Sequence, residues 1–182
     1  MRIVPIAGPA NCGCIGLTVW PKRPLDPNAQ PTPRQRIEKY IRQISDWRAR
    51  VLVSVLEERE IYRLGVRDIG DVATLSYIWW FPLPFEEGKA PDETFMYAWS
   101  RAAPVLLDRL RTDERVVFQG CGDPARVSLV ACCLLVELGL SADQALNSVR
   151  QGHADLELTP VQEQFIRGYQ PLYPEKGTSL GH

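Results

Sequence analysis

The stretch Arg115-Val-Val-Phe-Gln-Gly-Cys-Gly-Asp-Pro-Ala-Arg126, which runs into the apolar residues 127–136, decides the fold. Residues 116–118 are apolar and β-branched or aromatic, which predicts a strand. Residues 126–139 are apolar on most sides, which predicts a buried helix. The short turn between them sets the amino end of a helix beside the carboxyl end of a strand. Unsatisfied N–H groups and the helix dipole favour an anion at such a position.

Cys121 and Arg126 would add phosphoryl chemistry to this turn. A helix amino end stabilises a thiolate, and a guanidinium binds phosphate through two parallel hydrogen bonds. The spacing argues against this use, because only four residues separate the two side chains. A loop closing over so short a span would be tight, and Pro124 removes one of its amides. A loop with an incidental thiol is therefore the favoured interpretation.

The remaining segments alternate between strand and helix patterns. Further strands are predicted at 2–6, 15–20, 51–56 and 77–81, and helices at 33–45, 57–64, 69–76 and 92–111, with two more beginning at Ser141 and Thr159. This order predicts an α/β fold with a central, mostly parallel sheet flanked by helices. Ligands bind at the carboxyl ends of the strands in such folds, where loops 82–91 and 119–126 lie.

Length and composition predict one domain over residues 1–182. Within it, 1–31 would form amino-terminal strands and a Pro-rich loop, and 171–182 a flexible tail. The chain has 21 basic and 22 acidic residues, a balance that favours neither nucleic acid nor a membrane surface as partner. No run approaches the roughly 20 apolar residues of a membrane helix. Five cysteines, an odd number in close pairs, indicate reduced thiols and a cytoplasmic location.

Several segments carry a resemblance to a known family: Gly16-Leu-Thr18, Val53-Ser-Val-Leu-Glu-Glu-Arg-Glu-Ile61 with Leu64-Gly-Val66, Phe81-Pro-Leu-Pro84 with Ala90-Pro-Asp92, and Arg126 leading into Leu129-Val-Ala-Cys-Cys-Leu-Leu135. With these segments the chain resembles the protein tyrosine and dual-specificity phosphatase superfamily, in particular its small members similar to cyclin-dependent-kinase inhibitor 3. The resemblance covers most of the chain and implies a dual-specificity-phosphatase-like fold.

The catalytic motif of that superfamily is matched poorly. The motif reads His-Cys-x-x-Gly-x-x-Arg-Ser/Thr, and anchoring it on Arg126 places Gln119 at the His and Gly120 at the nucleophile. Asp123 then takes the place of the loop glycine and Val127 that of the Ser or Thr. A glycine cannot form a phosphoenzyme. The carboxylate of Asp123 would repel phosphate, and we expect it to approach Arg126 and neutralise it.

The general acid of the superfamily is an Asp on the Pro-rich loop, and the resemblance places it at Glu87, or at Glu86 if the loop slips by one residue. A glutamic acid can donate a proton, but its extra methylene displaces the carboxyl group from the reacting oxygen. Trp79 and Trp80 precede this loop on a strand. One ring should therefore point to each face of the sheet, one into the core and one beside the loop.

These observations predict a pseudophosphatase that acts as a binding or regulatory module. Its candidate ligand-binding residues are Gln119, Gly120, Gly122, Asp123 and Arg126. The expected partner is a protein or a phosphorylated ligand, and no cofactor is expected.

Two alternatives stay open. One is an atypical phosphatase with Cys121 as nucleophile, Arg126 as phosphate ligand and Glu87 as acid. The other is reuse of the cleft for a different class of ligand. A metal site is not expected, because Cys12 and Cys14 could supply only half of one and histidines are scarce.

Overall fold

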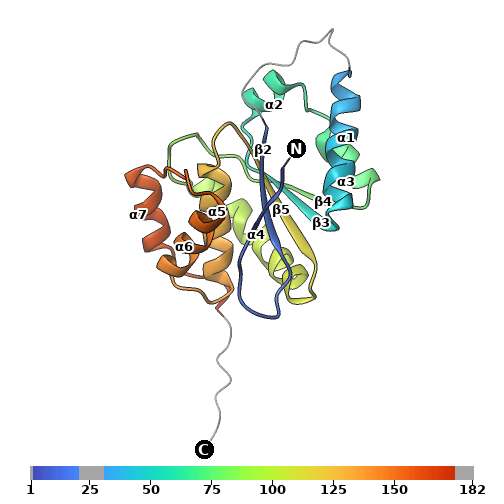
Figure 1. Ribbon diagram of the computed structural model, residues 1–182. Helices are drawn as coiled ribbons and strands as arrows, with labels where there is room; N and C mark the ends of the chain where they lie inside the picture. The colour runs from blue at the N-terminus through green and yellow to red at the C-terminus, as the bar shows by residue number, and fades with distance from the viewer. Residues whose placement is uncertain (1, 21–30, 175–182) are drawn as a thin grey trace, which may run out of the picture.

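A five-stranded sheet forms the centre of the described structure, a computed structural model that covers residues 2–20 and 31–174 (Figure 1). The strands are β1 (Val4–Ile6), β2 (Ile15–Trp20), β3 (Ala49–Ser54), β4 (Trp79–Pro82) and β5 (Arg115–Cys121), in the order β1-β2-β5-β3-β4. β1 runs antiparallel to β2, and the other pairs are parallel. The predicted α/β class with a mostly parallel sheet is confirmed.

Helices cover both faces of this sheet (Figure 1). On one side lie α1 (Pro33–Asp46), α2 (Glu58–Leu64) and α3 (Ile69–Leu75), and on the other α4 (Glu93–Arg111), α5 (Ala125–Glu137), α6 (Ala142–Gly152) and α7 (Pro160–Gly168). Each side buries its own apolar cluster. The cluster on the second side, around α5, is the larger one, and every residue of α5 is buried. We call these the α1 face and the α5 face.

Local signals set the helix ends as the sequence predicts. Thr32, Ser141 and Thr159 each form a capping box with the glutamine three positions later, an arrangement that satisfies two N–H groups at the helix start. Asp92 caps α4 by accepting from the Phe95 N–H, and α2 ends at Gly65 in the left-handed conformation with φ 64°.

Strand β5 is longer than the pattern indicates. A strand was expected at 116–118, but β5 extends to Cys121 because β2 pairs with it over its whole carboxyl half, matching Val19 to Gly120 and Trp20 to Cys121. Neighbouring side chains of a strand point to opposite faces. Gly120 and Cys121 therefore belong to different sides of the sheet.

The carboxyl end of the described chain is tied to α5. The buried Glu137 carboxylate accepts hydrogen bonds from the Tyr169 hydroxyl and from the N–H groups of Leu172 and Tyr173. The segment expected to be a flexible tail thus begins with anchored residues, and 175–182 lies outside the described residues. So does most of the predicted Pro-rich loop, 21–30. Among the described residues, no helix is long and apolar enough to cross a membrane.

Candidate functional site

Arg126, the anchor of the motif, is buried in an ion pair with Glu60. Its side chain is 2% exposed, and Nη1 and Nη2 donate to the two Glu60 carboxylate oxygens at 2.8 and 2.6 Å. Nη1 also donates to the backbone oxygens of Val55 at 3.1 Å and Phe85 at 3.2 Å. Bidentate ion pairs of this kind are strong and directional. The guanidinium is therefore already engaged by protein oxygens.

The expected approach of Asp123 to Arg126 is wrong. Asp123 instead accepts the Ala125 N–H through Oδ1 at 2.8 Å, the short-range contact typical of an aspartate beside a turn. Sequence reasoning missed Glu60 as the partner of the arginine. The sequence did contain an indication of this partner. Glu60 lies in the first turn of the helix that follows β3, and both this helix start and the 119–126 loop lie at the carboxyl ends of the strands.

Few backbone N–H groups of the 119–126 loop are left for an anion. The Gly122 N–H donates to the Trp20 oxygen at 2.8 Å, and the Ala125 N–H is taken by Asp123. Pro124, the N-cap of α5, has no N–H to offer. An anion cradle needs several unpaired amides aimed at one point, and here the chain itself occupies or lacks three of them.

Gly120, which the resemblance places at the nucleophile, lies in apolar surroundings on the α5 face. A Cβ atom at this position would lie 3.0 Å from Cγ1 of Val127, 3.5 Å from Cγ2 of Val55 and 3.8 Å from Cγ1 of Val19. The first contact is tighter than most contacts of a Cβ atom, so Val127 would have to shift to accommodate it. The Val127 methyl group thus occupies space next to the one that a larger side chain would need.

Cys121 points to the other side, into the apolar cluster of the α1 face, and is 1% exposed. Burial raises the pKa of its thiol, and the charge of Glu60 adds to this; Arg63, whose Nη2 lies 3.8 Å from Sγ, acts in the opposite direction. A buried thiol with a raised pKa is a poor nucleophile at neutral pH.

Gln119 takes part in a buried hydrogen-bond chain on the α1 face. The Trp80 indole N–H donates to Ser54 Oγ at 2.9 Å, and Ser54 Oγ donates to Gln119 Oε1 at 2.8 Å. Gln119 is fully buried. Its side chain is thus turned away from α5 and joins neighbouring strands, since β3 pairs with both β4 and β5.

Glu87 and Asp123 line the same cavity, of about 330 Å³, at the amino end of α5. Asp155 and Glu157, from the connection between α6 and α7, line the same cavity, and sequence reasoning did not single them out. We call it the acidic cavity. Four carboxylates around one hollow oppose phosphate binding.

The wall of the acidic cavity is held in place by α7. The Thr159 hydroxyl donates to the Gly88 oxygen at 3.0 Å, and Gln162 Nε2 donates to the Lys89 oxygen at 3.3 Å. Both side chains also cap α7. The loop that carries Glu86 and Glu87 is therefore fastened to a helix start.

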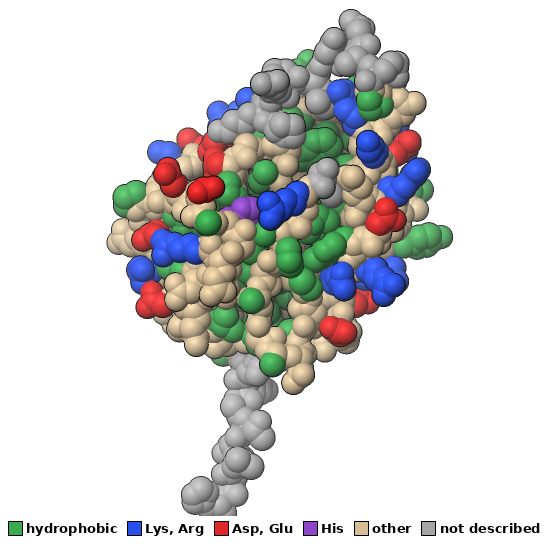
Figure 2. Space-filling view, in the orientation of Figure 1, with side chains coloured by type: hydrophobic (Ala, Val, Ile, Leu, Met, Phe, Trp, Pro, Cys, Tyr) green, Lys and Arg blue, Asp and Glu red, His purple; other side chains and the backbone are tan. Residues whose placement is uncertain are grey.

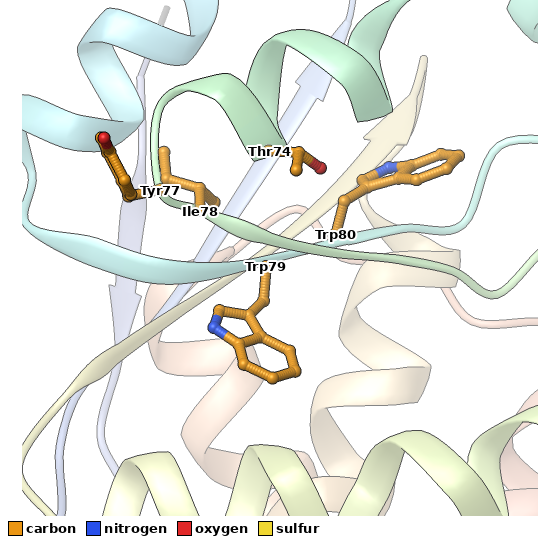
Figure 3. Close-up of a pocket in the computed structure, with 5 residues that line it drawn as sticks. All are labelled: Thr74, Tyr77, Ile78, Trp79 and Trp80. Carbon is orange, nitrogen blue, oxygen red and sulfur yellow. The ribbon is translucent and has the colours of Figure 1, made fainter.

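A separate cavity of about 410 Å³ lies at the edge strand β4, lined by Thr74, Tyr77, Ile78, Trp79 and Trp80. Figure 3 shows the Trp79 and Trp80 rings on opposite sides of the strand, as the alternation predicts. Trp80 packs against the core of the α1 face, whereas Trp79 is 53% exposed. None of the described residues that line this cavity is charged, so its surroundings do not suit phosphoryl chemistry.

Comparison with known proteins adds the fold relationship. No protein-family model matches the sequence, and no curated protein matches it. Solved structures do match. Kinase associated phosphatase, with serine replacing its catalytic cysteine, has a TM-score of 0.73 and 18% identity, over 91% of each chain. A protein tyrosine phosphatase (putative) from Leishmania major has a TM-score of 0.69 and 18% identity, over 93% of this chain and 99% of that one.

A third match is Tk-PTP. The active form of Tk-PTP has a TM-score of 0.60 and 17% identity, over 84% of this chain and 88% of that chain. Likeness at such identities extends to the fold and not to the chemistry. The chain has the fold of the protein tyrosine and dual-specificity phosphatases.

Proposed function

We propose that this protein is a pseudophosphatase, a binding or regulatory module of the phosphatase fold that does not turn over phosphate esters. The observation that carries the proposal is the surroundings of Gly120. The position that the resemblance assigns to the nucleophile has no side chain, and Val127 occupies the neighbouring space at 3.0 Å from where a Cβ would lie. Covalent phosphoryl transfer requires a nucleophile at this point.

Three further features support the loss of phosphate chemistry. The guanidinium of Arg126 is engaged by Glu60 and two backbone oxygens. Asp123 puts a carboxylate at the start of α5. Glu87 shares the acidic cavity with it. Each raises the free energy of a bound phosphate.

The module would act by occupancy. A protein partner or a phosphorylated ligand would bind at the cleft between loops 82–91 and 119–126. It would be released without chemical change. Hydrogen bonds from α7 to residues 88–89 hold one wall of the cleft in place, which favours this role. The five cysteines are free thiols, which supports the proposed cytoplasmic location.

The alternative is an atypical phosphatase that uses Cys121, Arg126 and Glu87. The contact of Arg63 with the Cys121 sulfur favours it, because a guanidinium stabilises a thiolate. The burial of Cys121 and its direction into the α1 face weigh against it.

Hydrolysis of p-nitrophenyl phosphate separates these functions. The wild-type chain and Cys121→Ser should show the same background rate. Clear wild-type activity that disappears in Cys121→Ser would overturn the proposal in favour of the alternative.

Restoring the motif tests whether the scaffold still positions the chemistry. Gln119→His, Gly120→Cys and Asp123→Gly supply the motif's residues, and Val127→Ser supplies its hydroxyl and removes the methyl group that crowds position 120. Activity that appears with all four changes, and not when Val127 is kept, would show that the scaffold still positions the chemistry.

A further inference from the structure

A second cavity, of about 440 Å³, adjoins the acidic cavity. It is lined by Arg2, Pro124, Gln151, Gly152, His153, Ala154 and Asp155, and it shares Pro124 and Asp155 with its neighbour. Figure 2 shows the resulting charge pattern on one face, with a histidine between a basic side chain and a group of acidic ones. The volume lies in the range of roughly 300–1,000 Å³ that is usual for small-molecule sites. We call it the Arg2–His153 cavity.

Gly152 explains why two distant parts of the chain meet there. A Cβ on Gly152 would lie 2.5 Å from Cδ1 of Ile6 and 3.2 Å from Cγ1 of Val4. A side chain at this position would have to displace the Ile6 side chain, so glycine favours the close packing of the end of α6 on β1. Arg2 precedes β1 and His153 follows Gly152, so the close packing brings both basic side chains to one cavity.

One buried polar atom of the residues that line the cavity lacks a partner. His153 Nε2 is shielded from solvent and has no hydrogen-bond partner among the described residues. Burial lowers the pKa of His153, and the positive charge of Arg2 lowers it further. Among the described residues that line the cavity, Asp155 is the other charged group. Arg150, three residues before His153 on α6, is paired with Glu163. An acceptor with negative charge would stabilise both the guanidinium and a protonated imidazole.

We propose that the Arg2–His153 cavity binds an oxyanion, a phosphate or sulfate group, free or at the end of a ligand's side chain. The inference rests on the proposed non-catalytic function, because it gives the phosphorylated ligand of that module a place beside the 119–126 loop. In the loop itself, Asp123 and Glu60 occupy the groups that an anion would use. Asp155 stands on the wall between the two cavities and opposes the anion.

The test is a titration of the ¹⁵N-labelled full chain with sodium sulfate, followed by amide chemical shifts at constant ionic strength. Saturable shifts should centre on 151–155. Sulfate does not titrate near neutrality, so the pH dependence reports the protein. Binding should tighten by about threefold or more from pH 8 to pH 6, because a bound anion favours protonated His153.

Matched variants assign the site. Arg2→Gln and His153→Gln should each weaken sulfate binding by about tenfold, because each removes a positive charge beside the anion. Asp155→Asn should strengthen it, and Arg42→Gln, on α1 at the opposite face, should leave it unchanged. His153→Gln should also abolish the pH dependence. A second titration with O-phosphoserine should shift the same amides if the group is carried by a side chain, whereas shifts with sulfate alone would indicate a free anion.

Two outcomes would overturn the inference. One is the absence of saturable shifts at 151–155, or shifts that both glutamine variants retain. The other is saturable shifts centred on 121–126, which would return the anion to the loop. Hydrolysis of p-nitrophenyl phosphate reports the proposed function separately. If the protein is inactive and does not bind sulfate, only the inference is wrong. If it is active and Cys121→Ser abolishes the activity, the proposed function is wrong.

Discussion

The two faces of the sheet differ sharply at the carboxyl end of β5. On the α5 face, Gly120 has no side chain and lies among three valines. On the α1 face, Gln119 and Cys121 are both buried, one in a hydrogen-bond chain and the other in an apolar cluster. Residues one apart in a strand face opposite ways. The thiol nearest the motif's nucleophile in sequence is therefore on the wrong side of the sheet for an attack at the α5 face.

Polar groups are also handled differently at the carboxyl edge of the sheet, between α5 and α2, and on the α1 face. At the edge, the buried charge of Arg126 is matched by Glu60 with both nitrogens engaged. On the α1 face, neutral groups form a chain of hydrogen bonds from Trp80 through Ser54 to Gln119. The first arrangement depends on a buried charge and its carboxylate partners, and the second on bonds between neutral groups. Mutations that break the charged arrangement should therefore lower the free energy of unfolding more than mutations that break the neutral one.

Breaking the charged pair should have the largest effect. Glu60→Ala removes the bidentate partner of the buried Arg126 guanidinium and leaves only the more distant Glu57 carboxylate, 3.9 Å from Nη1, which should lower the free energy of unfolding by about 3–5 kcal/mol. Urea unfolding followed by circular dichroism measures it.

The control is Glu38→Ala, which removes the exposed partner of Arg34 and should change stability little. Equal effects of the two variants would show that the buried pair has no special weight. In Glu60→Leu with Arg126→Met, apolar side chains replace both charges, so much of the lost stability should return.

Filling the empty position should have the next largest effect. Gly120→Cys forces its Cβ against Val127 and should destabilise the protein by about 1–3 kcal/mol. A double-mutant cycle with Val127→Ala should give a favourable coupling of at least about 0.5 kcal/mol, because the smaller residue relieves the contact.

Gly168→Ala is the matched control, since a Cβ there meets nothing within 4 Å. It should be neutral or slightly stabilising in α7. Additive effects of the Gly120 and Val127 changes would contradict the crowding.

Cutting the hydrogen-bond chain on the α1 face should cost less. Ser54→Ala leaves Trp80 Nε1 without an acceptor and Gln119 Oε1 without a donor, which should lower the free energy of unfolding by about 1–2 kcal/mol. The Trp80 indole N–H resonance should shift at the same time. The exposed Ser45→Ala in α1 should leave both quantities nearly unchanged; an equal loss in both variants would contradict the chain.

The smallest expected effect is a difference between the alkylation rates of Cys121 and Cys12. The raised pKa of Cys121 means that less thiolate is present at any given pH than for an ordinary cysteine, so alkylation should be slow at pH 7 and 8 and rise only at higher pH. Cys12, which is partly exposed, should react first. Mass spectrometry of native protein treated with iodoacetamide measures both. Rapid labelling of Cys121 at pH 7 would contradict its position in the core.

Much of the fold could be predicted because its signals are local. The capping boxes at Thr32, Ser141 and Thr159 formed as their spacing predicts. The partner of Arg126 could not be predicted in the same way. Asp123 is near in sequence but turns to a backbone N–H, whereas Glu60 lies 66 positions away and is brought in by the pairing of β3 with β5.

The sequence by itself determined the α/β class, the helix starts and the absence of a cysteine six positions before Arg126, because these depend on spacing along one segment. The tertiary structure decided which face each side chain of β5 takes, which carboxylate meets the arginine, and that Arg2 and His153 share a cavity. These outcomes depend on strand register and on the close packing at Gly152, which join segments far apart in the chain. Local spacing carries no information about such distances.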